Sequence, residues 1–210
     1  MPIAWNTAAL KRVIAALGAV IAVVFLAVAG LFAYSAAAVD DLSDQSETKL
    51  VARASASALA RMEEDVASAA IWTDAYHAVA RRDQDWLQIN FGDYYADFMH
   101  HDVTVVYDGA GAAVYASRAS EPVAPEGEQA FSEAVAPLLL EVAAESRQRR
   151  LDPAGKRQVG FDAVAARQSF VDVGGEIYMV AASNVVAEQV ADATLPGPEA
   201  TVVSARKLDG

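Results

Sequence analysis

An uncharged, apolar run of 27 residues near the N-terminus, Val13 to Val39, constrains this chain more than any other feature of its sequence. Alanine, valine, leucine, isoleucine and phenylalanine dominate it. A helix needs about 20 such residues to cross the hydrocarbon core of a bilayer. Lys11 and Arg12 precede the run, and carboxylates follow it from Asp40 onward. The positive-inside rule therefore predicts a membrane helix with a cytoplasmic N-terminus and an exported remainder.

A cleaved signal peptide is the competing interpretation of the same run. Ala36-Ala37-Ala38 supplies small residues of the kind found at cleavage sites. The apolar part of a signal peptide, however, has only about 7 to 15 residues, and this run is longer. We therefore favour an uncleaved anchor.

Charge and composition exclude several classes of function. The chain holds 16 basic and 28 acidic residues, and its formal net charge is −12. Because Lys11 and Arg12 lie before the apolar run, the exported part carries 14 basic against 28 acidic residues. A surface of this sign repels phosphate backbones, so we expect no nucleic-acid binding. The absence of cysteine excludes disulfides, thiolate catalysis and cysteine-ligated metals.

The segment 40–82 contains neither proline nor glycine and is rich in helix-forming residues. It predicts one long helix that rises from the membrane as a stalk. A stripe of small and apolar residues follows steps of three and four along it: Ala52, Ser55, Leu59, Met62, Val66, Ala69, Thr73, Tyr76 and Ala80. This stripe is either a weak dimerisation seam or the face that packs on the chain's own head, and the two readings are compatible.

Near the end of this predicted helix, Trp72, Asp74 and Tyr76 form the most distinctive short pattern in the chain. On a helix, Trp72 and Tyr76 are neighbours four residues apart, whereas Asp74 points elsewhere. The carboxylate of Asp74 either satisfies backbone amides or an arginine where the stalk meets the head, or it contacts a ligand directly. We interpret the pattern as a docking point between stalk and head.

After Arg82 the sequence predicts an α+β head. The aromatic and acidic residues between 86 and 98 favour short turns over a long helix. A helix is expected at 131–150, where arginines at its end complement the helix dipole. Connecting loops are expected at 120–129, 151–160 and 196–198. Five antiparallel strands are predicted, with turns at 108–111 and 174–175: 103–107, 113–117, 168–173, 176–183 and 201–205.

No catalytic or metal site is predicted. The three histidines are His77, His100 and His101. Adjacent residues of a strand face opposite sides, so His100 and His101 cannot easily reach one metal ion. The sequence contains no nucleophile elbow or other hydrolase motif. We therefore expect no cofactor and no enzyme activity in this segment.

Three stretches together resemble a known family: Trp72-x-Asp74-x-Tyr76, then Tyr107-Asp108-Gly109 after a strand, then the closing strand Val202 to Arg206. Over about Leu50 to Leu208 the chain is similar to CHASE-type extracellular sensor domains, type four. This resemblance implies a PAS-like sheet between helices, at the N-terminus of a bacterial membrane signalling protein. Most such proteins are diguanylate cyclases or cyclic-di-GMP phosphodiesterases, and some are histidine kinases.

The resemblance also implies a second membrane helix after the last strand. The expected organisation is then a cytoplasmic N-terminus (1–12), a transmembrane helix (13–39), a stalk with the first sensor helix (40–82) and a periplasmic head (83–210). The chain would be the sensory part of a longer protein of the bacterial inner membrane, cut before its second span.

In a PAS-like head, Tyr115, Arg118 and Tyr178 would lie on or beside the strands where a pocket opens. Arg118 is the best cation for an acidic ligand because guanidinium binds carboxylate with two hydrogen bonds; its alternative is a solvated charge at the rim. The first hypothesis is a homodimeric sensor of an unknown small molecule. The alternative is an anchored module that binds a periplasmic protein and needs no small-molecule pocket.

Overall fold

The computed structural model describes residues 7–195 and 199–208. The chain divides into two structural units, residues 1–54 and 55–210. We describe each by itself. The predicted loop 196–198 and the end of the chain at 209–210 lie outside the described residues.

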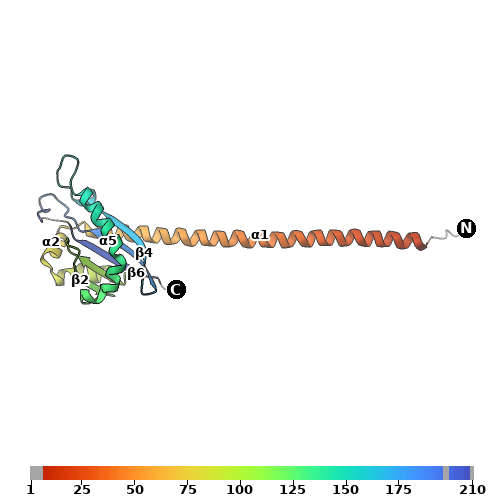
Figure 1. Cartoon of the computed structure of the whole chain (residues 1–210), viewed down its shortest axis with the longest axis horizontal. Helices are drawn as coiled ribbons and strands as arrows, with labels where there is room; N and C mark the ends of the chain where they lie inside the picture. Colours follow the sequence, from red (N-terminus) through yellow and green to blue (C-terminus); the bar gives the residue numbers. More distant parts are fainter. Residues whose placement is uncertain (1–6, 196–198, 209–210) are drawn as a thin grey trace. The chain divides into compact units, whose positions relative to one another are not determined.

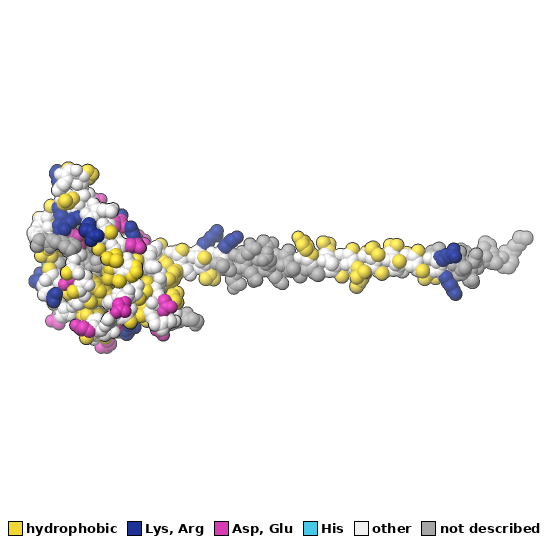
Figure 2. Space-filling view, viewed as in Figure 1, with side chains coloured by type: hydrophobic (Ala, Val, Ile, Leu, Met, Phe, Trp, Pro, Cys, Tyr) yellow, Lys and Arg dark blue, Asp and Glu magenta, His cyan; other side chains and the backbone are white. Residues whose placement is uncertain are grey.

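The first unit consists of most of helix α1 (Thr7–Ala70, 64 residues) (Figure 1). Its segment Ile14–Phe32 has a mean hydropathy of 2.8, and none of it is buried within the structure. Large apolar side chains such as Phe25 and Phe32 are exposed on it. Figure 2 shows hydrophobic side chains, in yellow, along this part of the helix. A helix that is apolar on all sides needs an apolar environment. Its length and composition are sufficient to cross a membrane.

A six-stranded antiparallel sheet forms the centre of the second unit. The strands are β1 (Val103–Tyr107), β2 (Ala113–Arg118), β3 (Glu121–Pro122), β4 (Ala166–Val173), β5 (Glu176–Asn184) and β6 (Thr201–Lys207). Their order across the sheet is β3-β2-β1-β6-β5-β4. The predicted α+β class is confirmed, and the arrangement is compatible with a PAS-like fold with an inserted helix. The sixth strand, β3, is a two-residue edge that pairs with β2 within a segment we expected to be a loop.

The strands and turns otherwise follow the prediction closely. The hairpin of β4 and β5 turns through Gly174 and Gly175, both at positive φ, which glycine adopts without steric cost. The inserted helix α5 (Gln129–Arg149) follows a short 3₁₀ turn, η2 (Pro125–Glu128). A second 3₁₀ turn, η3 (Gly160–Asp162), lies in the expected connector region before β4.

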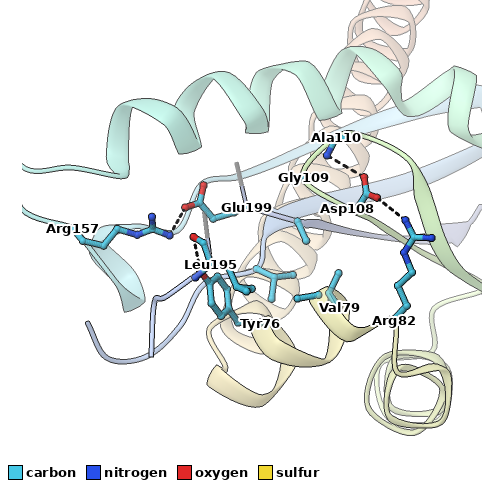
Figure 3. A pocket seen from close by; sticks show the side chains of 12 residues that line it. Tyr76, Val79, Arg82, Asp108, Gly109, Ala110, Arg157, Leu195 and Glu199 are labelled. Atoms are coloured by element: carbon cyan, nitrogen blue, oxygen red, sulfur yellow. Dashed lines mark hydrogen bonds and ion pairs between the residues drawn. The ribbon is translucent and has the colours of Figure 1, made fainter. Parts of the chain in front are cut away.

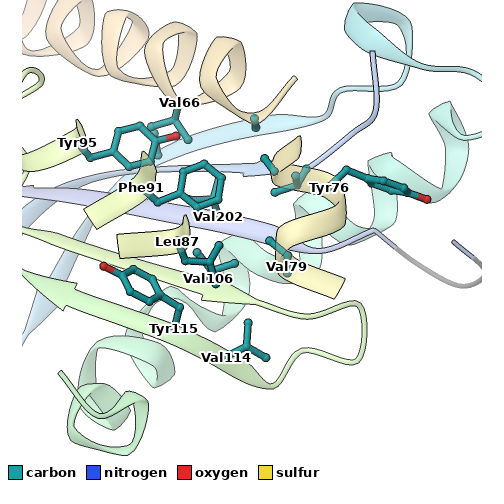
Figure 4. Close-up of a cluster of buried hydrophobic side chains, with 14 of the residues drawn as sticks. Val66, Tyr76, Val79, Leu87, Phe91, Tyr95, Val106, Val114, Tyr115 and Val202 are labelled. Atoms are coloured by element: carbon teal, nitrogen blue, oxygen red, sulfur yellow. The ribbon is translucent and has the colours of Figure 1, made fainter. Parts of the chain in front are cut away.

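Helices cover both faces of the sheet. On the α5 face, Phe131, Val135 and Val142 pack on β-strand residues such as Val105 and Val203. On the opposite face, which we call the α1 face, the C-terminal part of α1 packs with the helical segments of residues 73–97. Adjacent strand residues alternate between the two cores, as the pleat of a strand requires: Val202 belongs to the α1 face (Figure 4) and Val203 to the α5 face.

The stripe predicted on the stalk helix packs on the chain's own head along its distal part. Leu59, Met62 and Val66 are buried in the core of the α1 face. Each removes most of an aliphatic side chain from water, which stabilises the fold by about 1.5–3 kcal/mol per residue. The head-packing interpretation therefore holds for this part of the stripe.

The prediction of one uninterrupted helix to Arg82 is wrong. Helix α1 ends at Ala70, and α2 (Thr73–Arg81) begins after a break at Ile71 and Trp72. Trp72 is extended, with φ −154° and ψ 121°. The break exchanges helical hydrogen bonds for bonds to a distant segment: the Trp72 amide donates to the Val186 carbonyl (3.1 Å), and the Val186 amide donates to the Ala70 carbonyl (3.0 Å). A parallel bridge thus joins Ile71 to Val186.

The prediction of short turns between Trp86 and Phe98 is also wrong. Residues 84–97 are helical throughout, as α3 (Gln84–Leu87), the π-helical turn η1 (Gln88–Asp93) and α4 (Tyr94–Asp97). Asp83 caps the start, its carboxylate accepting a hydrogen bond from the Trp86 amide at 3.2 Å. Leu87, Phe91 and Tyr95 are fully buried on one side (Figure 4). Their burial drives the segment onto the sheet.

Candidate functional site

A cavity of about 570 Å³ lies beside helix α2 and the start of β6 (Figure 3). We call it the α2 cavity. Its size is within the range of about 300–1,000 Å³ that is typical of small-molecule sites. It is lined by Tyr76, Val79, Ala80, Arg82, Asp108, Gly109, Ala110, Arg157, Val185, Leu195, Glu199 and Ala200. The lining residues come from five separate parts of the chain, which the fold alone brings together.

Tyr76 joins α2 to the segment before β6. Its ring is buried in the core of the α1 face, while its hydroxyl reaches the Leu195 backbone. The hydroxyl accepts a hydrogen bond from the Leu195 amide at 3.0 Å and lies 3.4 Å from the Leu195 carbonyl oxygen. A buried ring with a polar tip is a common element of ligand sites because it combines apolar area with one directional contact.

Arg82 and Asp108 form an ion pair at one end of the cavity, with 3.2 Å between Nη2 and Oδ2. Asp108 also accepts hydrogen bonds from the amides of Ala110 and Ala112, both at 3.0 Å, so its turn is fixed. Arg82 ends α2 in the left-handed conformation, with φ 54° and ψ 43°. Glycine adopts this conformation far more readily than a residue with a side chain.

Glu199 is the second carboxylate of the cavity and is held by three partners. Arg157 lies at 2.9 Å and Arg150 at 3.4 Å from its Oε1, while the Ser146 hydroxyl donates to its Oε2 at 2.9 Å. Its side chain is only 6% exposed. The α2 cavity therefore offers two arginines, two carboxylates and a hydroxyl among apolar walls. Polar groups held in fixed positions among apolar walls can orient a small polar molecule.

The structure separates the three residues of the Trp-x-Asp-x-Tyr pattern. Tyr76 lines the α2 cavity, but Trp72 does not stack on it along one helix as predicted, because Trp72 stands in the break before α2. Trp72 packs edge-on against Trp86, with 4.9 Å between the ring centroids. Asp74 is exposed in the first turn of α2, where a carboxylate favours the helix dipole. Within the described residues its side chain makes no hydrogen bond or ion pair.

The connection that we expected from Asp74 is made by Thr73. The Thr73 hydroxyl accepts a hydrogen bond from the Glu188 amide, and the Thr73 amide donates to the Glu188 carboxylate, both at 3.2 Å. These bonds act together with the backbone hydrogen bonds that Ala70 and Trp72 make to Val186. We call residues 70–73 and 186–188 the latch.

The three predicted strand residues divide between the two faces of the sheet: Arg118 and Tyr178 lie close together on one side, and Tyr115 lies on the other. Tyr115 belongs to the α1 face, where its hydroxyl donates to the Gln88 side chain at 2.9 Å. Its pKa is raised, chiefly by burial. Tyr178 belongs to the α5 face, where its ring packs edge-on against Phe131. Neither residue, nor Arg118, lines the α2 cavity.

Arg118 binds an internal carboxylate. Its guanidinium makes two hydrogen bonds to Glu128, at 3.0 Å and 2.7 Å, and this bonding raises its pKa. Glu128 is buried, so the pair closes the end of the α5 face. We expected Arg118 to bind the carboxylate of a ligand through two hydrogen bonds. It makes these two hydrogen bonds to Glu128 of the same chain instead.

His101 is the one strongly perturbed histidine of the described residues. It is 6% exposed, stacks on Tyr95 and lies 2.7 Å, through Nδ1, from the Ser204 hydroxyl. Burial lowers its pKa to about 4, helped by the positive charge of Arg206. His100 precedes it at φ 57°. Among the described residues no group of three or more histidines and carboxylates is arranged to hold a metal ion.

Sequence reasoning missed Arg82, Arg157 and Glu199. The turn at Asp108 was recognised, but nothing local connects it with α2 or β6. One signal was available. Arg82 directly follows the last residue of α2, a position where glycine or asparagine is usual, and its backbone there is left-handed.

The family model of the CHASE4 domain matches residues 56–210. The chain therefore belongs to the CHASE4 domain family, whose members are extracellular sensory, non-catalytic domains of signalling proteins. No curated protein matches the chain at a significant level. The predicted family is confirmed.

Proposed function

We propose that this chain is the sensory part of a transmembrane signalling protein of the bacterial inner membrane. In this proposal its N-terminus is cytoplasmic, α1 crosses the membrane and residues after 40 are periplasmic. A small molecule binds in the α2 cavity, and the binding energy shifts α1 relative to β6. The output domain, a cyclic-di-GMP cyclase or phosphodiesterase or a histidine kinase, follows beyond residue 210.

The observation that carries this proposal is the position of the α2 cavity. One side of it is α2, which is joined to the end of α1 through the latch. The other side includes Glu199 and Ala200, which lead directly into β6. A ligand that draws these two sides together or apart would move α1 relative to β6. In this proposal the chain leaves the membrane through α1 and returns to it after β6. A ligand shifts such an equilibrium only by its difference in affinity for the two states.

Homodimerisation is part of the proposal. Anchoring two copies in one membrane raises their effective concentration. Paired α1 helices carry a displacement across a bilayer better than one helix, because each serves as the other's fixed reference.

The alternative function, a periplasmic protein-interaction module, is favoured by a different observation. Phe161 and Leu151 are exposed apolar side chains, 75% and 51%, near the connector between α5 and β4. Large apolar side chains that are exposed in this way are available to pack against a bound protein. A partner bound there requires no small-molecule cavity.

The deciding experiment is a thermal-shift screen of the full chain in nanodiscs against a broad panel of small metabolites. We expect at least one compound to raise the unfolding midpoint. Tyr76→Phe should then weaken that compound's binding about tenfold. The substitution removes the hydroxyl that faces the cavity and that holds the Leu195 backbone in its wall. Tyr178→Phe, which removes a hydroxyl on the α5 face, is the matched control and should bind normally.

Two results together would remove direct sensing. The first is that no compound in the panel stabilises the chain. The second is that Asp74→Ala and Tyr76→Phe leave the output of the complete signalling protein unchanged. A Phe161→Ala variant that loses a periplasmic partner would then support the interaction module.

A further inference from the structure

A second cavity, of about 590 Å³, lies at the break between α1 and α2 and is distinct from the α2 cavity. We call it the aromatic cavity. Ala69 lines it from the last turn of α1 and Trp72 from the break. The remaining lining residues come from the helical segment 84–97 and the residue after it: Ile89, Asn90, Asp93, Tyr94 and Phe98. No lining residue is shared with the α2 cavity. A ligand here would act on the same junction from a different side.

Three aromatic side chains line this cavity and are held by other rings. Trp72 packs against Trp86, and the rings of Tyr94 and Phe98 lie 5.4 Å apart. All three lining rings are exposed, Phe98 by 74%, Tyr94 by 41% and Trp72 by 36%. The face of an aromatic ring carries partial negative charge and attracts cations within about 6 Å. Leaving such rings in water costs free energy that a bound ligand would recover.

The charge of the aromatic cavity has one sign. Asp93 is the one carboxylate among its lining residues, and none of these residues is a lysine or arginine. Asp93 accepts one hydrogen bond, from the Gln88 amide at 2.5 Å, and within the described residues no cation pairs with it. The α2 cavity differs, because each of its carboxylates already has an arginine. The aromatic cavity therefore has an uncompensated negative charge beside electron-rich rings.

We propose that the aromatic cavity binds an alkylated ammonium ion, a cation with an apolar shell. Such an ion matches both properties of the site. Its methyl or alkyl groups cover the aromatic surface without the strong hydration of a primary ammonium, and its charge faces Asp93 and the rings. A neutral apolar molecule would leave Asp93 without a partner, and a small hydrated cation would leave the rings exposed.

The test is a titration of the full chain in nanodiscs, by calorimetry, with choline and with its uncharged analogue, in which carbon replaces the quaternary nitrogen. The two probes have the same shape and differ in charge. We expect choline to bind at least tenfold more tightly than the analogue. Equal affinity of the two, or no measurable binding of choline at millimolar concentration, overturns the proposal.

Variants then locate the site. Phe98→Leu keeps an apolar side chain but removes the ring face, so choline binding should weaken about two- to fivefold while binding of the analogue is unchanged. Asp93→Asn should weaken choline binding about tenfold. Phe161→Leu is the matched control, because Phe161 is 75% exposed and lies outside the cavity. It should bind choline normally, and an equal loss in Phe161→Leu would overturn the assignment.

Phe98 is 74% exposed, so Phe98→Leu should not destabilise the fold. An unchanged thermal unfolding midpoint would verify this. A different outcome is that Phe98→Leu leaves choline binding intact but converts a dimer to a monomer. The surface would then be an interface between copies of the chain, and the proposal would be wrong. The two cavities share no lining residue. Tyr76→Phe should therefore weaken binding in the α2 cavity alone, and Phe98→Leu should weaken choline binding alone.

Discussion

The two faces of the sheet are built on different plans. The α5 face is covered by one continuous helix, and ion pairs join that cover to the sheet: Arg118 of β2 with Glu128, and Arg167 of β4 with Glu145. The α1 face is covered by several shorter helical segments that are interrupted at the latch and widened by a π turn. Both cavities are lined by this interrupted cover. The comparison indicates that one face is a scaffold and the other is the part that can change.

The interruptions on the α1 face have a specific physical meaning. At the latch, helical hydrogen bonds are replaced by bonds to Val186 and Glu188, more than a hundred residues along the chain. Such bonds depend on tertiary structure, so they can be lost without unfolding α1 or α2. Elements that move are drawn from regions of low local stability. The α5 face, by contrast, is a closely packed core of aliphatic and aromatic side chains under one continuous helix.

The largest expected effect comes from deleting one buried ring on each face. Phe91→Ala and Phe131→Ala should each lower the free energy of unfolding by about 3–5 kcal/mol, through lost burial and the cavity that remains. They should differ in the native state. Phe91 packs edge-on against Trp86 at 5.7 Å, so Phe91→Ala should shift the native tryptophan emission. Phe131→Ala should leave it unchanged.

Urea unfolding of the full chain in detergent, followed by tryptophan fluorescence and by circular dichroism, measures both quantities. If Phe131→Ala disturbs the tryptophans as much as Phe91→Ala, the two faces are not independent. The division into scaffold and responsive face would then be wrong.

Acid should act on the α1 face selectively, through His101. The folded chain keeps this imidazole neutral down to a pKa of about 4, against an ordinary value of 6.5. The unfolded chain therefore binds the proton first as the pH falls. Stability from this group is complete above pH 6.5 and decreases as the pH falls toward 4, by roughly 3 kcal/mol in total. Unfolding free energies measured across this window should show the slope.

The control for the acid effect is His101→Asn, which retains a polar group near Ser204 but does not titrate. Its unfolding free energy should be lower at neutral pH and flatter between pH 6.5 and 4. An equally steep curve in His101→Asn would assign the effect to carboxylates elsewhere.

The smallest effect concerns the latch. Thr73→Val keeps the shape of the side chain but removes the acceptor for the Glu188 amide, which should cost about 1 kcal/mol. Hydrogen exchange of the Glu188 amide should accelerate, while amides of the α5 face are unaffected. Ser169→Ala, which removes a hydroxyl bonded to the neighbouring Phe170 carbonyl, is the control. Unchanged exchange at Glu188 would show that the latch does not depend on this contact.

The sequence predicted the elements whose signals are local. The β-branched strand Val103–Tyr107 was predicted with its observed bounds, and the hairpin at Gly174-Gly175 required only its two glycines. Helix α5 was predicted within two residues at its start. In each case the residues that form the element also mark its limits.

The errors occurred where distant residues decide the structure. The break at Ile71 is not marked by proline or glycine. It is formed by hydrogen bonds to Val186, which is distant in the sequence, so the local sequence gives no sign of it. The helical segment 84–97 was read as turns because its aromatic residues suggested no regular period. Leu87, Phe91 and Tyr95 are nevertheless spaced four apart, which is a helical signal that a π turn accommodates.

The candidate site was predictable only in part. Tyr76 was named in advance, and the α2 cavity does contain it. Its charged residues could not be grouped from the sequence, since Arg82, Arg157 and Glu199 become neighbours only when the sheet and both connectors are in place. Trp72 was predicted as a partner of Tyr76 but lines a different cavity.

At Arg82, backbone stability and the charge of the α2 cavity favour different residues. A left-handed residue other than glycine costs about 1–2 kcal/mol, and the ion pair with Asp108 at the surface recovers about 1 kcal/mol at most. Arg82→Gly would therefore make the chain more stable or leave it unchanged. It would also remove a positive charge from the wall of the α2 cavity. Engineering this domain for thermal robustness, a common aim with biosensors, would therefore select a substitution that alters the charge of the α2 cavity.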